Sequence, residues 1–207
     1  MSKSLPVTYF DDLYAGNGDP WGFESRWYEH RKHACTLAAL PEPRYRSAFE
    51  PGCSGGVLSA RLAAHCEQLL CCDIAEEPVR SARRRLSDVA AHANVVVRRL
   101  TVPHEWPTGP FDLVVISELA YYFDGDDRRR LWDHVADTLE PGGTLVTVHW
   151  RHPVAEYPAT GDAVHAELAT RPEFGRLAKH LETDFLLDVH QRIPPPARSV
   201  AQHARLV

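Results

Sequence analysis

Short apolar segments alternate with longer amphipathic segments over residues 47–149, and this alternation constrains the fold more than any other feature. The apolar segments predict strands at 47–50, 68–73, 95–99, 111–117 and 144–149. The segments between them predict helices at 56–65, 78–91 and 126–140. Residues 113–116 are apolar at every position, which is typical of a parallel strand covered by helices on both faces. We therefore expect an α/β fold with a doubly wound, mostly parallel sheet.

The two ends of the chain cover and complete this sheet. Residues 1–45 predict an N-terminal helical cover, with helices at 8–14 and 25–40, and residues 46–150 form the expected cofactor-binding core. Residues 151–207 predict C-terminal helices and edge strands: helices within 162–180, then extended segments at 184–192 and 199–207 separated by three prolines. With no helix between them, these two segments predict an antiparallel hairpin at one edge. It would complete a seven-stranded sheet in a single domain of residues 1–207.

The balance of charge argues against nucleic acid as a partner. Asp and Glu number 28 against 23 Lys and Arg, so the net charge of −5 has the wrong sign for a chain that neutralises phosphates. No segment has the length and apolar content of a membrane span, and the first residues lack the apolar run of a signal peptide. We expect a cytoplasmic monomer or homodimer, with neither nucleic acid nor membrane as a partner.

A glycine-rich turn follows the first predicted strand. Its residues are Glu50-Pro51-Gly52-Cys53-Ser54-Gly55-Gly56, and glycine lets the backbone approach a ligand with no Cβ in the way. The second strand ends at Asp73, 21 residues after Gly52, where a carboxylate can accept hydrogen bonds from ribose hydroxyls. Together the turn and Asp73 predict a nucleoside-binding crevice at the carboxyl ends of the first two strands.

The details of the turn distinguish two classes of nucleoside cofactor. A nicotinamide cofactor carries a pyrophosphate, which the pattern G-x-G-x-x-G binds at a helix N-terminus. That spacing is absent here, and the carboxylate of Glu50 beside the turn would repel a pyrophosphate. An acidic neighbour suits a ligand with an amino group and a sulfonium. The turn therefore favours S-adenosylmethionine.

The order of motifs beyond the turn resembles a known family. The turn and Asp73 are followed by Phe111-Asp112-Leu113-Val114-Val115-Ile116-Ser117-Glu118 with Tyr121-Tyr122, and then by Leu139-Glu140-Pro141-Gly142-Gly143. Over about residues 46–150 this order resembles the class I S-adenosylmethionine-dependent methyltransferases, which implies their Rossmann-like fold.

Within that family, the chain is most similar to the nodulation-protein-S group. The similarity lies in Glu118 with its tyrosine pair, Asp19-Pro20-Trp21 and Tyr28-Glu29-His30-Arg31-Lys32-His33. Members of the group N-methylate the amino sugar of a lipo-chitooligosaccharide. The resemblance therefore implies methyl transfer to a small-molecule acceptor, an amine on a sugar-like or natural-product substrate.

Cofactor-binding residues are expected in the N-terminal cover and along the carboxyl ends of the strands. They are Trp21, Arg31, Glu50, Gly52, Cys53, Gly56, Asp73, Ile74, Thr101, Val102 and Ser117. By the resemblance, Trp21 would lie over the cofactor, and Arg31 or His33 would approach its carboxylate. Two positions depart from the family pattern. Ser54 replaces the middle glycine of G-x-G-x-G, and Thr101 stands where an acidic residue commonly contacts the adenine amino group.

Acceptor-binding and catalytic residues are expected beyond the fourth and fifth strands. His149 is the candidate general base, because an unperturbed histidine pKa of about 6.5 suits proton transfer at neutral pH. Glu118 is expected to orient the cofactor or an acceptor amine. The candidate substrate-binding residues are Tyr121, Tyr122, Trp150 and His152. No metal is expected, since the histidine pairs lack a third ligand at a recognised spacing.

Three alternatives stay open on these residues. An O-methyltransferase acting on a small hydroxylated or carboxylated product fits the same motifs. Ser54 and Thr101 are also compatible with a non-catalytic cofactor-binding or scaffold protein of the same fold. A nicotinamide oxidoreductase is the least favoured, because of Glu50 and the glycine spacing.

Overall fold

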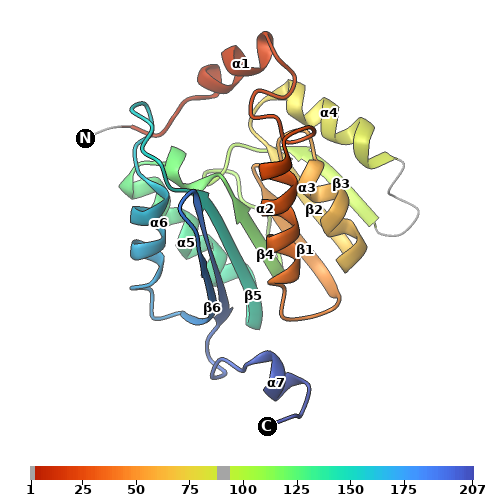
Figure 1. Ribbon diagram of the computed structural model, residues 1–207, viewed down its shortest axis with the longest axis vertical. Helices are drawn as coiled ribbons and strands as arrows, with labels where there is room; N and C mark the ends of the chain where they lie inside the picture. The colour runs from red at the N-terminus through yellow and green to blue at the C-terminus, as the bar shows by residue number, and fades with distance from the viewer. Residues whose placement is uncertain (1–2, 88–93) are drawn as a thin grey trace.

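A seven-stranded mixed sheet forms the centre of the molecule. The computed structural model describes residues 3–87 and 94–207 (Figure 1). The strand order is β3-β2-β1-β4-β5-β7-β6, and β7 runs antiparallel to both of its neighbours. The strands are β1 Tyr45–Pro51, β2 Cys66–Asp73, β3 Asn94–Arg99, β4 Phe111–Ser117, β5 Leu139–Trp150, β6 Phe174–Leu181 and β7 Phe185–Arg192. The expected fold class is confirmed: a doubly wound, mostly parallel sheet with an antiparallel hairpin at one edge.

Helices cover both faces of this sheet (Figure 1). They are α1 Val7–Ala15, α2 Trp27–Ala38, α3 Val57–Leu62, α4 Glu76–Ser87, α5 Gly125–Thr138, α6 Gly161–Leu168 and α7 Val200–His203, with 3-10 turns η1 Ala63–His65 and η2 Ala120–Tyr122. The helix predicted at 78–91 corresponds to α4, and its residues 88–91 lie outside the described residues. None of the helices in the described ranges is both long and apolar enough to cross a bilayer.

Strand β4 packs against helices on both of its faces. Leu113 and Val115 lie in one buried cluster with side chains of α3 and α4, whereas Val114 and Ile116 lie in another with side chains of α5 and α6. All four are completely buried. Because successive strand residues point to opposite faces, a sheet covered on both sides requires an uninterrupted apolar run.

The edge hairpin uses different residues from those predicted. It pairs β6 with β7, whereas the sequence predicted helix as far as residue 180. Helix α6 ends at Leu168 instead. The outer backbone groups of β7 need hydrogen-bond partners, and β6 supplies them.

The strand predicted at 199–207 is also wrong. Helix α7 begins there with a capping box. The Ser199 hydroxyl accepts a hydrogen bond from the backbone N–H of Gln202, and the Gln202 side chain accepts one from the backbone N–H of Ser199. The prolines before it cannot donate hydrogen bonds to a sheet, so they end β7 rather than turn the chain back onto it.

The carboxyl ends of the parallel strands converge beneath α1. Figure 1 shows α1 across this end of the sheet and α7 at the opposite end. Near α7, His203 Nδ1 lies 2.8 Å from Glu42 Oε1, in the connection between α2 and β1. Helix α1 and the C-terminal helix α7 therefore lie at opposite ends of the strands.

Asp112 completes the hydrogen bonding at the start of β1. Strands β1 and β4 pair at Ala48 and Phe49. Just before this pairing, the Asp112 carboxylate accepts hydrogen bonds from the backbone N–H groups of Arg46 and Ser47, both at 2.9 Å. The Asp112 side chain on β4 thus supplies the hydrogen-bond acceptors that strand pairing would otherwise supply at this point of the sheet.

Replacing Asp112 by alanine should destabilise the protein, because two backbone donors lose their acceptor. The expected loss in free energy of unfolding is about 1–3 kcal/mol, measured by urea denaturation. Asp137→Ala, at an exposed position near the end of α5, is the control and should change stability by less than about 0.5 kcal/mol. Equal losses in the two variants would show that Asp112 does not hold β1 against β4.

Candidate functional site

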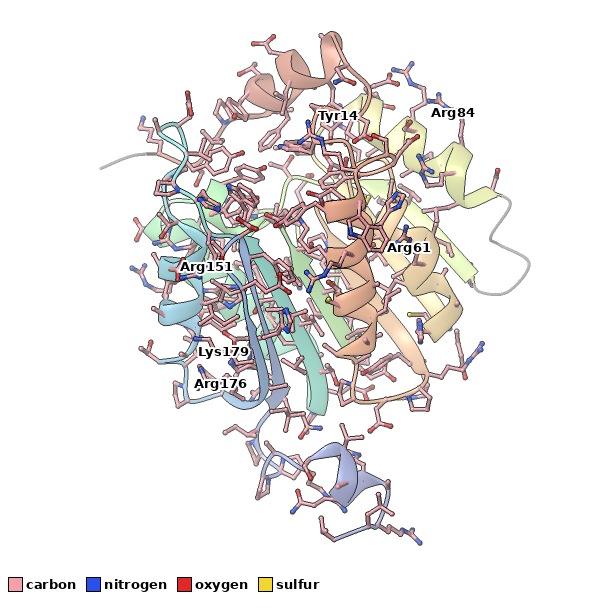
Figure 2. The ribbon with its side chains drawn as sticks, viewed as in Figure 1. Tyr14, Arg61, Arg84, Arg151, Arg176 and Lys179 are labelled. Atoms are coloured by element: carbon pink, nitrogen blue, oxygen red, sulfur yellow. The ribbon has the colours of Figure 1, made fainter. Side chains whose placement is uncertain are left out.

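A cavity of about 580 Å³ lies at the carboxyl ends of β1, β2 and β4, beneath the N-terminal cover. Most of the residues expected from the sequence line it: Trp21, Glu50, Gly52, Cys53, Asp73, Ile74, Thr101, Val102, Ser117, Glu118, Tyr121, Tyr122 and Trp150. Arg31, Gly56, His149 and His152 do not. Figure 2 shows Tyr14 on α1, at this end of the molecule. The fold therefore gathers side chains from distant parts of the chain around one space.

The glycine-rich turn takes left-handed backbone conformations. Gly52 has φ +74°, and a Cβ there would lie 3.0 Å from the Leu119 side chain. Ser54, at the position of the usual middle glycine, has φ +49°. Its backbone N–H donates to Asp73 Oδ2 at 3.0 Å, and its hydroxyl lies 2.6 Å from the Tyr14 hydroxyl. These contacts hold Ser54 in a conformation that L-residues rarely adopt.

Gly56 has a packing role in the same turn. It precedes α3 with φ +77°, and a Cβ there would lie 3.1 Å from the Cβ of Ala82 on α4. The position therefore requires glycine for close approach of two helices. This explains why Gly56 belongs to the motif although it does not line the cavity.

Asp73 presents a buried carboxylate at the end of β2. It is only 8% exposed, and its Oδ1 accepts a hydrogen bond from the backbone N–H of Ala75 at 3.1 Å. Burial raises its pKa to about 6, although the backbone donors oppose the rise. Each carboxylate oxygen has two lone pairs, so Asp73 keeps acceptor capacity for a ligand.

Glu50 is a second buried carboxylate, at the end of β1. It is 3% exposed and accepts a long hydrogen bond from the Cys71 thiol, with an S···O distance of 3.8 Å. Burial raises its pKa to about 7, and no cation of the described residues lowers it. A buried carboxylate without a cationic partner is costly, and a cationic ligand would remove that cost.

Aromatic side chains of the N-terminal cover form the wall nearest to these carboxylates. Trp21 packs against Tyr14 and Phe23, with ring centroids 5.6 Å apart in each pair. The Phe23 ring lies 6.0 Å from the ring of His33, whose buried Nδ1 has no hydrogen-bond partner. Burial lowers the pKa of His33 to about 3, so this ring is neutral.

Arg31 points away from the cavity. Its guanidinium donates two hydrogen bonds to Glu182, at 2.8 and 2.6 Å, in the turn between β6 and β7. Arg26, the N-cap residue of α2, lines the cavity instead. His152 also lies outside, paired with Asp184 at 2.7 Å. The sequence places Arg26 and Arg31 on one helical segment, but only packing decides which of them faces the cavity.

Glu118 is the centre of a buried polar network. It follows β4 with φ +54°, and Lys32 Nζ lies 2.7 Å from its Oε1. Its Oε2 accepts hydrogen bonds from the backbone N–H of Trp150 at 3.0 Å and from the Tyr121 hydroxyl. Lys32 also lies 2.9 Å from Glu29. Sequence reasoning missed Lys32 and Glu29, because a charged pair on an amphipathic helix normally indicates a solvated face.

His149 lies behind the cavity wall, completely buried. Its Nδ1 is 2.9 Å from His165 Nε2, and its Nε2 accepts a hydrogen bond from the backbone N–H of Ala120 at 3.2 Å. His165 Nδ1 in turn contacts Asp188 at 2.8 Å. Burial, reinforced by His165 and Lys32, lowers the pKa of His149 well below its usual value. Both ring nitrogens are occupied, so this geometry leaves none for an acceptor.

The described residues contain one cluster of metal-type ligands, Cys35, His180 and Glu182. It lies between α2 and the β6–β7 hairpin, outside the cavity. Arg31 and His180 already hold the Glu182 carboxylate.

The sequence matches methyltransferases over its central part. A family model described as a methyltransferase domain matches residues 49–145. Nodulation protein S of Rhizobium tropici is 33% identical over 130 residues, which are 62% of this chain and 53% of that protein. The chain thus spans little more than half the length of this relative.

Solved structures extend the similarity over most of the chain. A crystal structure from Pseudomonas syringae, described as a candidate methyltransferase, is 53% identical, covers 81% of this chain and 100% of that one, and has a TM-score of 0.69. The N-methyltransferase NodS of Bradyrhizobium japonicum WM9, in complex with S-adenosyl-l-homocysteine, is 21% identical, covers 90% of this chain and 97% of that one, and has a TM-score of 0.77. At 21% identity, the similarity to NodS shows that the two chains share a fold. The chain belongs to the class I S-adenosylmethionine-dependent methyltransferases, and it is similar to nodulation protein S over its central part.

Proposed function

We propose that this chain binds S-adenosylmethionine in the cavity and catalyses transfer of its methyl group to an amine of a small, sugar-like or natural-product acceptor. The observation that carries the proposal is the placement of two buried carboxylates, Glu50 and Asp73, at the carboxyl ends of β1 and β2, where both line the cavity. Asp73 is the acceptor for the ribose hydroxyls. Glu50 has no cationic partner among the described residues and faces the positively charged methionyl part.

The remaining cofactor contacts follow from the cavity lining. Ile74, Thr101 and Val102 border the adenine side, and Trp21 covers the ligand. Arg26 takes the carboxylate-binding role that resemblance implied for Arg31, because Arg26 faces the cavity and Arg31 is held by Glu182. Thr101 supplies a hydroxyl where the family commonly has an acidic residue, so adenine recognition rests more on shape and backbone groups here.

Catalysis by these residues consists of alignment and exclusion of water. The bound cofactor supplies a methyl group on a sulfonium and leaves as a neutral thioether. Alignment of two reactants can lower a barrier by several kcal/mol, on the order of 7–11 in the best intramolecular models. The aromatic cover, with α1 held to the turn through Tyr14 and Ser54, closes the cavity on that side.

The acceptor end lies around Glu118 and a cluster of tyrosines. Tyr121, Tyr122 and Tyr157 stack or meet edge to face, with centroids 4.7–5.0 Å apart, and all three line the cavity. Aromatic faces of this kind suit both a sugar ring and a cationic amine. The N-methyltransferase relative in the same fold supports an amine as the methyl acceptor.

His149 acts in this proposal as a positioning residue. Its Nε2 accepts the N–H of Ala120, the first residue of the turn that carries Tyr121 and Tyr122. The Tyr121 ring packs edge to face on the His149 ring, with centroids 5.2 Å apart. His149 therefore fixes the position of the acceptor-facing tyrosines without contacting the acceptor.

Calorimetric titration tests the proposed cofactor directly. We expect S-adenosylmethionine to bind with micromolar affinity and NADH not to bind, because the turn lacks a pyrophosphate site and carries Glu50. Binding of neither ligand would favour a scaffold protein of the same fold. Binding of NADH alone would overturn the proposal.

Replacing Asp73 by alanine should weaken cofactor binding, because the ribose hydroxyls lose their acceptor. We expect at least a tenfold rise in the Kd for S-adenosylmethionine, about 1.4 kcal/mol, in a calorimetric titration at about pH 8. Asp137→Ala, far from the cavity lining, should bind as the wild type does. An unchanged Kd in the Asp73 variant would remove this residue from the ribose site.

Cofactor binding should also weaken in acid. Because the pKa of Asp73 is about 6 and that of Glu50 about 7, both carboxylates become protonated as the pH falls through these values. The Kd should therefore rise at least tenfold between about pH 8 and pH 5. Glu50→Gln should flatten the upper part of this curve, since it removes the group that titrates first. A wild-type Kd that stays constant over this range, with the protein still folded, would contradict the assignment.

A further inference from the structure

One buried lysine is shared by two carboxylates at the acceptor end of the cavity. Lys32 Nζ lies 2.9 Å from Glu29 Oε2 and 2.7 Å from Glu118 Oε1. Lys32 is 2% exposed and Glu29 is 6% exposed. With all three groups ionised, the cluster carries one uncompensated negative charge in a nearly water-free place.

The two carboxylates differ in their free capacity. Glu118 is held by Lys32, by the Tyr121 hydroxyl and by the backbone N–H of Trp150. Among the described residues, the polar contact of the Glu29 carboxylate is the ion pair of its Oε2 with Lys32. Glu29 is therefore the carboxylate of the pair with more acceptor capacity left.

A buried polar atom without a partner lies beside Glu29. The hydroxyl of Tyr28 is buried and has no hydrogen-bond partner, and both side chains line the cavity. The Tyr28 ring lies 5.0 Å from Lys32 Nζ and meets the Trp150 ring edge to face, with centroids 5.5 Å apart. A ligand with hydrogen-bond donors and a positive charge would provide partners for the Tyr28 hydroxyl and the Glu29 carboxylate.

Burial and the charges around Glu29 together raise its pKa above that of an exposed glutamate. The groups that face it are Lys32 and Arg26 from α2 and Glu118 from the end of β4. Burial raises the pKa of Glu29, Lys32 and Arg26 oppose this rise, and Glu118 adds to it. A carboxyl group with a raised pKa is better matched to an amine than an ordinary exposed glutamate.

We propose that Glu29 binds the protonated amine of the acceptor and takes its proton. The ammonium N–H bond breaks and its proton moves to a Glu29 oxygen, which leaves the nitrogen lone pair free and the cluster neutral. The nitrogen then bonds to the methyl carbon while the carbon–sulfur bond breaks, so the positive charge passes to the product amine. Glu29 afterwards releases its proton to water. Lys32 is the positioning residue, since it holds Glu29 and Glu118 on either side of the acceptor.

This inference rests on the proposed methyl transfer, and the experiment separates the two. Enzyme saturated with S-adenosyl-l-homocysteine is titrated by calorimetry with glucosamine and glucose, and with benzylamine and benzyl alcohol. The two members of each pair differ in that one carries an amine where the other carries a hydroxyl. Failure to bind S-adenosyl-l-homocysteine would count against the proposed function itself. Normal binding of it followed by no preference for either amine would overturn the role of Glu29 alone.

Glu29→Gln is the decisive variant. We expect wild type to bind at least one amine ten times more tightly than its alcohol, and Glu29→Gln to lose that preference while it binds S-adenosyl-l-homocysteine unchanged. Glu29→Asp keeps the charge and should restore part of the preference. The matched control is Glu167→Gln, which removes a carboxylate held by Arg128 and Trp132 outside the cavity and should leave the preference intact.

Measurement of kcat then distinguishes a role of Glu29 in proton transfer from a role in packing. With an amine that binds, the kcat of Glu29→Gln should fall at least tenfold at about pH 7 and recover as the pH approaches the pKa of the free amine. Equal losses for the amine and its alcohol in binding, or a kcat lowered by the same factor at every pH, would assign Glu29 a structural role instead.

Discussion

The reversal of strand order at the centre of the sheet decides where this molecule can bind a ligand. From β1 the sheet continues to β2 on one side and to β4 on the other, so the connections leave their carboxyl ends in opposite directions and open a crevice. Gly52, Asp73 and Ser117 all line the cavity at this point. Asp112 stabilises the pairing of β1 with β4 by accepting hydrogen bonds from the first residues of β1.

Buried carboxylates then give the cavity its chemical character. Glu50 and Asp73 lie at the proposed cofactor end with raised pKa values, and Glu29 and Glu118 share one lysine at the proposed acceptor end. Burying these charges costs free energy, which a cationic ligand offsets. Both ligands in the proposed reaction, a sulfonium and an ammonium, carry a positive charge. The proposals for the two ends of the cavity therefore have a common electrostatic basis.

His149 and Trp150 show what strand periodicity alone does not predict. They are neighbours at the end of β5, so both were predicted to face the acceptor. Because strand residues alternate between faces, Trp150 lines the cavity while His149 meets His165 beneath it. A shift of one residue in the predicted register would have reversed the two roles. The sequence has no local signal that selects the register here, because a histidine and a tryptophan can each line a cavity.

The sequence by itself determined the strand–helix alternation, the doubly wound sheet and the glycine-rich turn before Asp73, since these follow from local periodicity and from the backbone freedom of glycine. Tertiary structure decided which residues at the ends of those elements meet. It turned Arg26 rather than Arg31 into the cavity, buried Lys32 between two carboxylates, and paired β6 with β7 where the sequence predicted a helix. Contacts between residues far apart in the chain depend on packing and on the pairing of backbone groups at a sheet edge, neither of which a local sequence pattern contains.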